Sequence, residues 1–303
     1  MKLYHILLLF EATHILAYFQ KGKYMKIGII GAGKVGFSIG KYLTEHKKNV
    51  VGYYSRTRES AMMAAEFTGT CVFESIEQLV QECEVLFIAV PDGTISTIWD
   101  KLNQYSLQNK KICHFSGAFS SQIFSNIKQY SAYGYSIHPL FAFADRYRSY
   151  LGLTEAVFSI EGAIEYLDEM KTVFQSMGNT VITVSTEDKV KYHAACASAS
   201  NLVLGLFEYS ESLLESCGFT KESAHRALIP LIKGNVDSYC LLGAEGALTG
   251  PIERNDTETV AKHMASLTSS EKEIYLMLSR QVLSLGKKKH PNYDYSKMEG
   301  ELQ

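Results

Sequence analysis

The chain has 303 residues, of which 46% are hydrophobic, and its net charge at pH 7 is -2. A chain of this length and composition can bury a large core, and the length favours two domains over one. The nearly neutral charge, with Lys and Arg spread along the sequence, argues against the basic surface of a nucleic-acid-binding protein.

Residues 1–24 precede the first recognisable strand. The apolar run "YHILLLF" is too short to span a bilayer, and Glu11 and His14 interrupt the residues that follow it. A signal peptide is the alternative, although no small-residue cleavage site precedes Lys21. Because "MKIGIIGAGKVG" begins at Met25, we expect residues 1–24 to be an extension outside the fold, and we expect no association with a membrane.

Short β-rich runs alternate with helical patterns from Lys26 to about Val184. The predicted strands are "KIGII", "NVVGYYS", "TCVF", "EVLFIAV", "KICHFS", "YGYSIH", "AVFSIE" and "TVITV". Helical patterns between them include "SIGKYLTEH", "RESAMMAAEF", "SIEQLVQEC" and "AIEYLDEMKTVFQSMG". This alternation predicts an α/β fold with a doubly wound, mostly parallel Rossmann sheet.

The strand pattern stops after Ser185, and the remaining sequence predicts an all-helical second domain. Its helices are expected to break at Gly218, at Pro230, in the Gly243–Pro251 loop and at Pro291. We therefore expect a dinucleotide-binding domain over 25–185 and a helical substrate and dimerisation domain over 186–290. The polar residues 291–303 are expected to form a frayed tail.

A glycine motif connects the first predicted strand to the first helix. Gly31, Gly33 and Gly36 have the spacing G-x-G-x-x-G, with Lys34 and Val35 between the last two. The first glycine permits a tight turn, the second lets the backbone approach a pyrophosphate, and the third lets the helix pack on the strand. Directly after a strand, the motif predicts a dinucleotide site at the helix N-terminus, and a turn without ligand is the alternative.

The end of the second predicted strand indicates which dinucleotide is bound. An NAD site has Asp or Glu here for the ribose 2′-hydroxyl, whereas this chain has Ser55, Arg56, Thr57 and Arg58 before the first carboxylate, Glu59. A serine hydroxyl and an arginine can bind a 2′-phosphate, which a carboxylate would repel. We therefore predict NADP, with Ser55 and Arg56 as its ligands. The alternative is that both arginines are solvated.

Polar and small residues follow the fourth, fifth and sixth predicted strands. They are Val90, Pro91 and Asp92, then Ser116 and Gly117, then His138. Ligands of open α/β sheets bind beyond the carboxyl ends of the strands. We expect the first three residues to lie along the cofactor and Ser116, Gly117 and His138 to bind substrate. Ordinary turns, which favour the same residue types, are the alternative.

The cysteine and histidine spacings predict neither a disulfide framework nor a metal site. The six cysteines are scattered and have no CxxC or CxxH spacing. Such a pattern fits reduced thiols in a cytoplasmic protein. The histidines at 114, 138, 193 and 263 have no ligand spacing, so we expect no metal.

Several motifs occur together in a fixed order between Met25 and about Leu285. They are "GAGKVG", "VPD", "HFSGA", "SIHPL", "KVKYHAACASASN" and "GALTGPIERNDTETVAKH". In this combination the sequence resembles a family of two-domain proteins, described as NADP oxidoreductases, with a Rossmann-like domain and a C-terminal domain of unknown function. It is more distantly similar to pyrroline-5-carboxylate reductases and β-hydroxyacid dehydrogenases. The resemblance implies an active site between the domains and a homodimer formed through the helical domain.

The same resemblance suggests acid/base groups at the start of the second domain. In β-hydroxyacid dehydrogenases a catalytic lysine occupies the matching helix, with an asparagine four residues later. Lys189 matches the lysine, but the residue four positions on is His193. We predict that His193, and secondly Lys189, carries protons. A solvated lysine and a histidine bonded to a backbone carbonyl are the alternatives.

Helical spacing adds neighbours to these two residues. Lys189, His193, Cys196 and Ser200 fall along one stripe of a helix, with Asn201 about a quarter-turn away. We predict that Asn201 contacts substrate.

The loop "GAEGALTGPIERND" supplies further polar groups. Arg254 can bind a substrate carboxylate or phosphate through two parallel hydrogen bonds, and Thr249 is a second predicted substrate ligand. Asp256 or Thr257 is expected to cap the helix that carries His263.

These observations favour an NADP-dependent oxidoreductase that moves a hydride between the nicotinamide and a small carbonyl or imine compound, such as a 2-keto or 3-hydroxy acid. The alternative from another class is a non-catalytic NADP-binding sensor or interaction protein. Such a protein would keep the glycine turn and Arg56 but would need no aligned acid/base groups.

Overall fold

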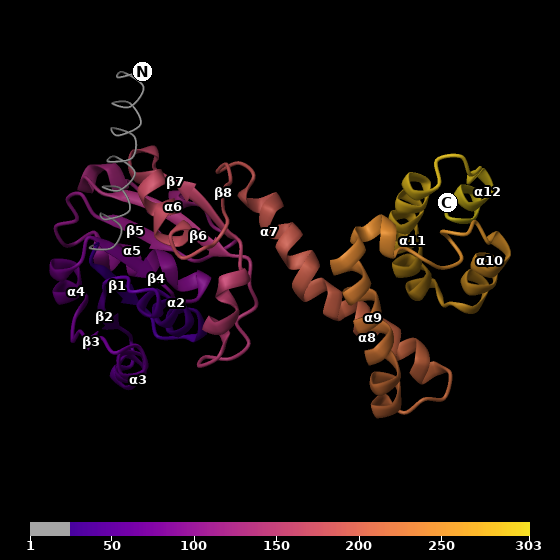
Figure 1. The fold of residues 1–303 in the computed structure, drawn as a ribbon, viewed down its shortest axis with the longest axis horizontal. Helices are drawn as coiled ribbons and strands as arrows, with labels where there is room; N and C mark the ends of the chain where they lie inside the picture. Colours follow the sequence, from indigo (N-terminus) through magenta and orange to yellow (C-terminus); the bar gives the residue numbers. More distant parts are fainter. Residues whose placement is uncertain (1–24) are drawn as a thin grey trace, which may run out of the picture. The chain divides into compact units, whose positions relative to one another are not determined.

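The computed structural model describes residues 25–303, so the predicted extension over 1–24 lies outside the described residues. The chain forms two compact units that divide between Val203 and Leu204 (Figure 1). No helix within 25–303 combines the length and apolarity that a membrane crossing requires.

The first unit contains one eight-stranded sheet, and every strand expected from the sequence is present in it. The strands are β1 (Ile27–Ile30), β2 (Val50–Tyr54), β3 (Cys71–Val72), β4 (Val85–Ile88), β5 (Lys111–His114), β6 (Tyr133–Pro139), β7 (Phe158–Gly162) and β8 (Val181–Thr183). Their order is β3-β2-β1-β4-β5-β6-β7-β8, and all neighbours are parallel except β6 and β7. The predicted mostly parallel Rossmann sheet is therefore confirmed.

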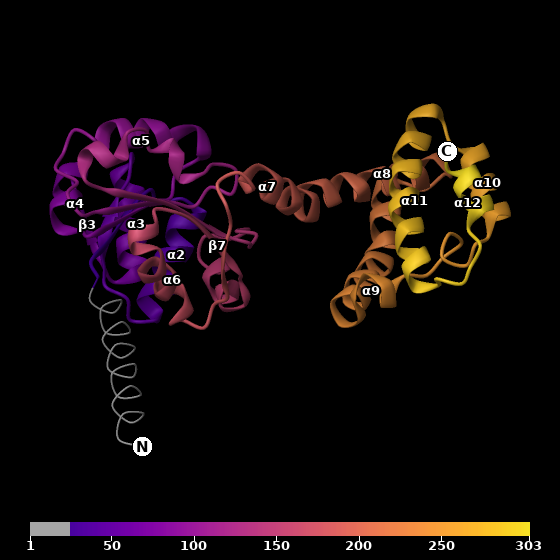
Figure 2. The same cartoon turned by 90° about the horizontal axis from the view of Figure 1, so that it is seen from above.

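Helices cover both faces of this sheet (Figure 2). The helices on one face are α2 (Lys34–Glu45), α3 (Arg58–Thr68) and α6 (Leu167–Gln175), and those on the other are α4 (Ile76–Glu82) and α5 (Ile95–Leu102). All residues of β1, β4 and β5 are buried, because a central strand of such a sheet is covered on both sides. The buried side chains form two clusters, one on each face of the sheet. Both clusters stabilise the fold, because full burial of one large apolar side chain contributes roughly 1.5–3 kcal/mol.

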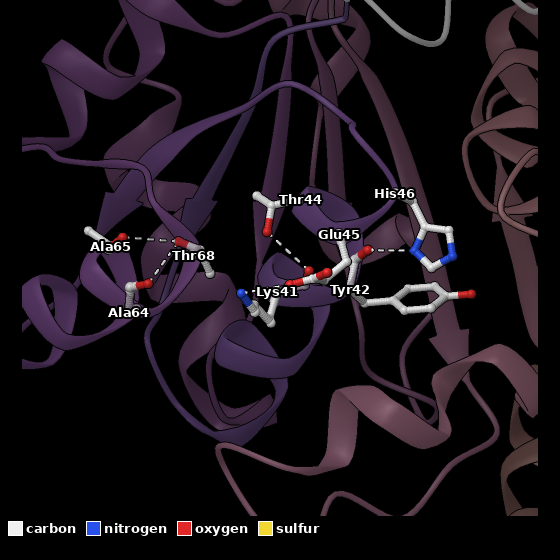
Figure 3. Close-up of polar contacts among 8 residues, drawn as sticks. All are labelled: Lys41, Tyr42, Thr44, Glu45, His46, Ala64, Ala65 and Thr68. Carbon is white, nitrogen blue, oxygen red and sulfur yellow. Dashed lines mark hydrogen bonds and ion pairs between the residues drawn. The ribbon is translucent and has the colours of Figure 1, made fainter.

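The helix that follows the glycine turn has a defined polar end (Figure 3). Lys41 forms an ion pair with Glu45 at 2.8 Å, and the ring of His46 lies 2.8 Å from the carbonyl oxygen of Tyr42. The Tyr42 hydroxyl donates to Asn179 Oδ1 at 2.8 Å, beyond α6. In α3, the Thr68 hydroxyl donates to the Ala64 carbonyl. Of these contacts, the bond from Tyr42 to Asn179 ties α2 to the segment after α6, and the others lie within one helix or its C-terminal cap.

The connections beyond β5 differ from the regular strand–helix alternation. Between β5 and β6 the chain forms two short 3₁₀ helices, Ser121–Ile123 and Ile127–Tyr130, and a third, Ser149–Glu155, lies between β6 and β7. β6 and β7 are therefore joined without a long helix and pair antiparallel. The parallel strands β1, β2, β4, β5 and β6 all end at the same edge, where the predicted ligand residues lie.

A helix after β8 completes the first unit. This helix, α7 (Lys189–Ala197), is followed directly by a π-helical turn, Ser198–Leu202. A π turn changes the helical phase, so a stripe of side chains cannot continue unchanged through it. The burial of the four residues in the predicted stripe accordingly decreases along the helix. Lys189 is buried, His193 and Cys196 are partly buried, and Ser200 is exposed.

The second unit is helical, as expected. Its helices are α8 (Val203–Ser216), α9 (Lys221–Ala247), α10 (Thr257–Ser266), α11 (Ser269–Lys289) and α12 (Ser296–Glu301). The breaks expected at Gly218 and Pro291 are confirmed, since α8 ends before Gly218 and α11 ends before Pro291. The break at Pro230 is wrong, because α9 continues through this exposed proline, where water can reach the carbonyl that loses its partner.

The predicted frayed tail is also wrong. Residues 296–301 form α12, and Tyr295, Met298 and Leu302 are buried in one cluster with Ile252, Val260 and Leu283. Arg280 donates a hydrogen bond from Nε to the Leu302 carbonyl at 2.7 Å. The apolar side chains stand about one and two helical turns apart, so a mostly polar segment still has an apolar face that packs.

Candidate functional site

The glycine turn has the geometry that its spacing predicts. Gly31 has φ of +106°, and a Cβ there would lie 2.4 Å from the Ala89 carbonyl oxygen. A Cβ at Gly36 would lie 2.1 Å from the Gly31 carbonyl oxygen, so this glycine lets α2 pack on the turn. A Cβ at Gly33 would meet no described atom within 4 Å. The middle glycine therefore faces open space, where a ligand can approach the backbone.

The N-terminus of α2 offers hydrogen-bond donors toward this space. Lys34, Val35 and Gly36 form the first turn, which has no acidic residue and no side-chain cap. The first amide bonded within the helix is that of Phe37, which donates to the Gly33 carbonyl at 3.0 Å. The earlier amides and the positive end of the helix dipole can therefore bind an anion.

A cavity of about 550 Å³ lies at this edge of the sheet. Of the residues predicted to bind the cofactor, its lining includes Gly31, Gly33, Ser55, Arg56, Val90 and Pro91. Asp92 is not among the lining residues, and its carboxylate accepts a hydrogen bond from the Ser116 hydroxyl at 2.9 Å. The assignment of individual residues to a cofactor stays a prediction.

The charge of the lining favours an anionic ligand. Arg56, Lys101 and Arg146 line the cavity, and no Asp or Glu is present among its described lining residues. The two arginines after β2 differ in their contacts. Arg58 binds Glu74 at 2.9 Å, whereas the Arg56 side chain makes no hydrogen bond or ion pair with residues 25–303. Sequence reasoning did not identify Lys101 or Arg146, because neither belongs to a motif.

A second group of polar side chains lies at the ends of β4, β5 and β6. The Ser116 hydroxyl donates to Asp92 and accepts the backbone amides of Ala118 and Phe119, each at 3.2 Å. The Ser116 amide donates to Nδ1 of His114 at 3.1 Å. His114 is therefore neutral at this nitrogen, and burial lowers its pKa to about 4. Ser116 thus holds the turn after β5 in one conformation.

Lys189 extends this network below the surface. Its side chain is only 1% exposed, and Nζ donates to the Ser136 hydroxyl at 2.9 Å. The Ser136 hydroxyl in turn donates to the Ser116 carbonyl at 3.2 Å. Burial lowers the pKa of Lys189, and the buried carboxylate of Glu161 opposes this shift. The alternative of a solvated lysine at a helix start is wrong.

Two histidines meet at Gly117. A Cβ at this glycine would lie 2.7 Å from Nδ1 of His193 and 2.8 Å from Nε2 of His138. The other ring nitrogen of His138, Nδ1, lies 2.7 Å from the Tyr192 hydroxyl, and burial lowers the His138 pKa to about 4. Nδ1 of His193 is buried and has no hydrogen-bond partner among the described residues. Ser116, Gly117, His138, Lys189 and His193 are therefore brought together within the first unit.

The remaining predicted site residues lie elsewhere. Asn201 is exposed in the π turn, next to Ser200. Thr249 and Arg254 are exposed in the loop before α10 in the second unit, where the Asp256 side chain accepts the Thr259 amide at 3.0 Å and caps the helix as expected. The roles of Asn201, Thr249 and Arg254 stay predictions. Across residues 25–303, no three His, Cys, Asp or Glu side chains are grouped as a metal site requires.

Two family models match consecutive parts of the chain. A Rossmann-like domain matches residues 17–139, and a domain of unknown function, DUF2520, matches residues 156–282. The chain therefore contains a Rossmann-like domain followed by a DUF2520 domain. Ser116 and His138 belong to the Rossmann-like match, and Lys189 and His193 belong to the DUF2520 match. The polar group at Gly117 is therefore built from both matched regions.

Solved structures share this fold. Protein TM1727 from Thermotoga maritima is 27% identical, with a TM-score of 0.67, and the match covers 85% of this chain and 98% of that one. The putative NADP oxidoreductase BF3122 from Bacteroides fragilis is 19% identical, with a TM-score of 0.66 and coverage of 86% and 99%. A pyrroline-5-carboxylate reductase from Coxiella burnetii is 16% identical, with a TM-score of 0.58 and coverage of 88% and 98%.

One curated relative matches over a shorter stretch. The putative 6-phosphogluconate dehydrogenase YqeC of Bacillus subtilis is 32% identical over 75 residues. The match spans 24% of this DUF2520 protein and a quarter, 25%, of the length of that relative.

Proposed function

We propose that this protein is an NADP-dependent oxidoreductase that transfers a hydride between the nicotinamide and a small carbonyl or imine compound. The observation that carries the proposal is the cavity at the glycine turn. It is lined by Arg56, which has no ionic partner within residues 25–303, and by no carboxylate of that part of the chain. The relatives named as NADP oxidoreductase and pyrroline-5-carboxylate reductase support the same reaction class. The free cysteines support a cytoplasmic location.

The residues at the cavity fit such a cofactor. Gly33 leaves open space beside the amides of the first turn of α2, where a pyrophosphate would be bound. Ser55 and Arg56 would bind a ribose 2′-phosphate. When it is bound, the reduced cofactor supplies the hydride at its nicotinamide.

The polar group at Gly117 would serve the proton transfer and the orientation of the substrate. We assign His193 as the acid/base group, because its buried Nδ1 has no partner among the described residues. Lys189 is assigned a positioning role, since its Nζ is bound to Ser136 and fixes the Ser116 carbonyl through it. His138, neutral near pH 7, would donate or accept a hydrogen bond without changing its charge.

A matched pair of arginine variants tests the cofactor. Arg56→Ala should weaken the binding of NADPH at least about tenfold and the binding of NADH by less than about twofold, because only NADPH carries the 2′-phosphate. Arg58→Ala is the control, since Arg58 is bound to Glu74, and it should change neither dissociation constant. Calorimetry gives both constants. Equal losses for the two nucleotides in Arg56→Ala would contradict the assignment.

The reaction class is tested separately by turnover. Wild-type protein should oxidise NADPH in the presence of at least one carbonyl or imine from a metabolite panel, and His193→Ala should lower kcat about 100-fold or more. Tight NADPH binding without turnover of any compound would favour the non-catalytic sensor instead.

A further inference from the structure

The segment between β6 and β7 crosses the face of α2 and α3. The Tyr147 ring lies edge-on to Phe37 of α2 at 5.3 Å and to Phe67 of α3 at 5.2 Å, and Tyr150 lies 5.8 Å from Phe67. Phe37 and Phe67 also contact each other, with ring centroids 6.0 Å apart. These aromatic contacts hold the segment, which follows the sixth strand, over the helices that follow the first and second strands.

A local turn directs Arg146 within this segment. The Asp145 carboxylate accepts the Tyr147 amide at 2.8 Å, and the Asp145 amide donates to the Ser149 hydroxyl at 3.1 Å. These bonds fix the backbone on both sides of Arg146. Its guanidinium carbon lies over the Phe37 ring, 4.7 Å from the centroid. Phe37 is therefore the platform on which this side chain is held.

Arg146 lines the same cavity as Arg56, although 90 residues separate them in the sequence. Its side chain is partly buried and makes no hydrogen bond or ion pair with residues 25–303. Removing part of a cation from water is unfavourable unless it is paired, and no carboxylate lines the cavity among the described residues. An arginine fork in this setting matches the oxygen atoms of a phosphate group.

We propose that Arg146 binds the ribose 2′-phosphate of NADP together with Arg56, so that two arginines from distant segments select the cofactor. This inference depends on the proposed function. The pyrophosphate already has the amides at the start of α2. The ring under Arg146 packs on α3, the helix that begins two residues after Arg56, so Arg146 lies on the side of the cavity where the 2′-phosphate is expected.

Two nucleotide fragments test the proposal without any substrate. Binding of 2′,5′-ADP and of 5′-AMP, which lacks only the 2′-phosphate, to the full chain is measured by calorimetry for wild type, Arg146→Ala and Arg148→Ala. Arg148 is the matched control, since it is an exposed arginine of the same segment that does not line the cavity. Arg146→Ala should weaken 2′,5′-ADP binding at least about tenfold and 5′-AMP binding less than about twofold, and Arg148→Ala should change neither.

A platform variant and a double variant sharpen the test. Phe37→Leu keeps an apolar side chain under Arg146 but removes the aromatic face, so it should weaken 2′,5′-ADP binding less than Arg146→Ala does. Arg56→Ala combined with Arg146→Ala should lose less affinity than the product of the two single losses, because both arginines bind one phosphate.

Three outcomes overturn the proposal. If Arg146→Ala weakens the binding of both fragments equally, this arginine does not bind the 2′-phosphate but a group that both fragments share. Unchanged binding in Arg146→Ala, with a selective loss in Arg56→Ala, would refute the role of Arg146 and leave the proposed function intact. If wild type binds the two fragments equally well, the choice of NADP fails and the role of Arg146 fails with it.

Discussion

The two compact units bury their apolar side chains to different extents. The first unit has two clusters, one on each face of its sheet, with Phe37, Trp99 and Phe174 almost fully buried. The second unit has one small cluster around Val260 and Met298. Its helices expose many large apolar side chains, including Leu204, Leu231, Val236, Tyr239, Leu241, Leu242 and Met277. The first unit thus buries large cores of its own, whereas the helices of the second leave more of their large apolar side chains exposed.

The largest expected effect concerns the exposed surface of the second unit. We expect a homodimer formed through the helical domain, as the resemblance of the sequence implies. Leu241 in α9 is 82% exposed, so Leu241→Arg should leave the fold intact and convert the dimer to a monomer. Light scattering coupled to size-exclusion chromatography measures the mass. Leu151→Arg, at a 62% exposed position of the first unit, should remain dimeric. A monomeric wild type would contradict the expected dimer, and a dimeric Leu241→Arg would contradict a dimer contact at this position of the second unit.

Alanine variants of two glycines in the first unit should differ in their effect on stability, although both weaken NADPH binding. Gly36→Ala places a methyl group against the Gly31 carbonyl, so it should lower the free energy of unfolding by about 1–3 kcal/mol and also abolish NADPH binding. Gly33→Ala meets no described atom, so it should weaken NADPH binding without lowering the melting temperature by more than about 2 °C. Thermal denaturation and calorimetry give the two readouts. Equal melting temperatures for both variants would contradict the different roles of the two glycines.

A smaller effect is expected from the buried histidine of the first unit. The His114 pKa is about 4 in the folded chain and about 6.5 in an unfolded chain, so the unfolded state binds more protons between these values. The neutral His114 side chain therefore makes its full contribution to the free energy of unfolding above about pH 6.5, and this contribution is lost as the pH falls toward 4. Between pH 7 and pH 5 the loss is about 2 kcal/mol.

Denaturation with urea at pH 7, 6 and 5 measures this loss. His114→Gln, which can keep one donor and one acceptor, should reduce the fall in stability, whereas His225→Gln in the second unit, on a side chain that is 63% exposed, should not. A fall of the same size in wild type and His114→Gln would show that other groups cause it.

The features that the sequence predicted correctly depend on local patterns. Each strand could be recognised from its own apolar residues, and the glycine turn from three positions. Lys189 illustrates the limit, since its burial depends on Ser136, 53 residues earlier, and its local sequence is that of a solvated helix start. The position of Arg146 depends on aromatic packing between three segments. The π turn Ser198–Leu202 shifts the side chains around the helix axis, which regular helical spacing cannot predict.

Gly117 has a practical consequence for experiments on this protein. A Cβ at this position would lie 2.7 Å from Nδ1 of His193 and 2.8 Å from Nε2 of His138, so a methyl group would fill the space beside both rings. Gly117→Ala would therefore fill this space without removing an ionisable group, at a position that does not line the cavity at the glycine turn. We expect such a variant to bind NADPH but to have no turnover, because the methyl group takes the space beside both histidines.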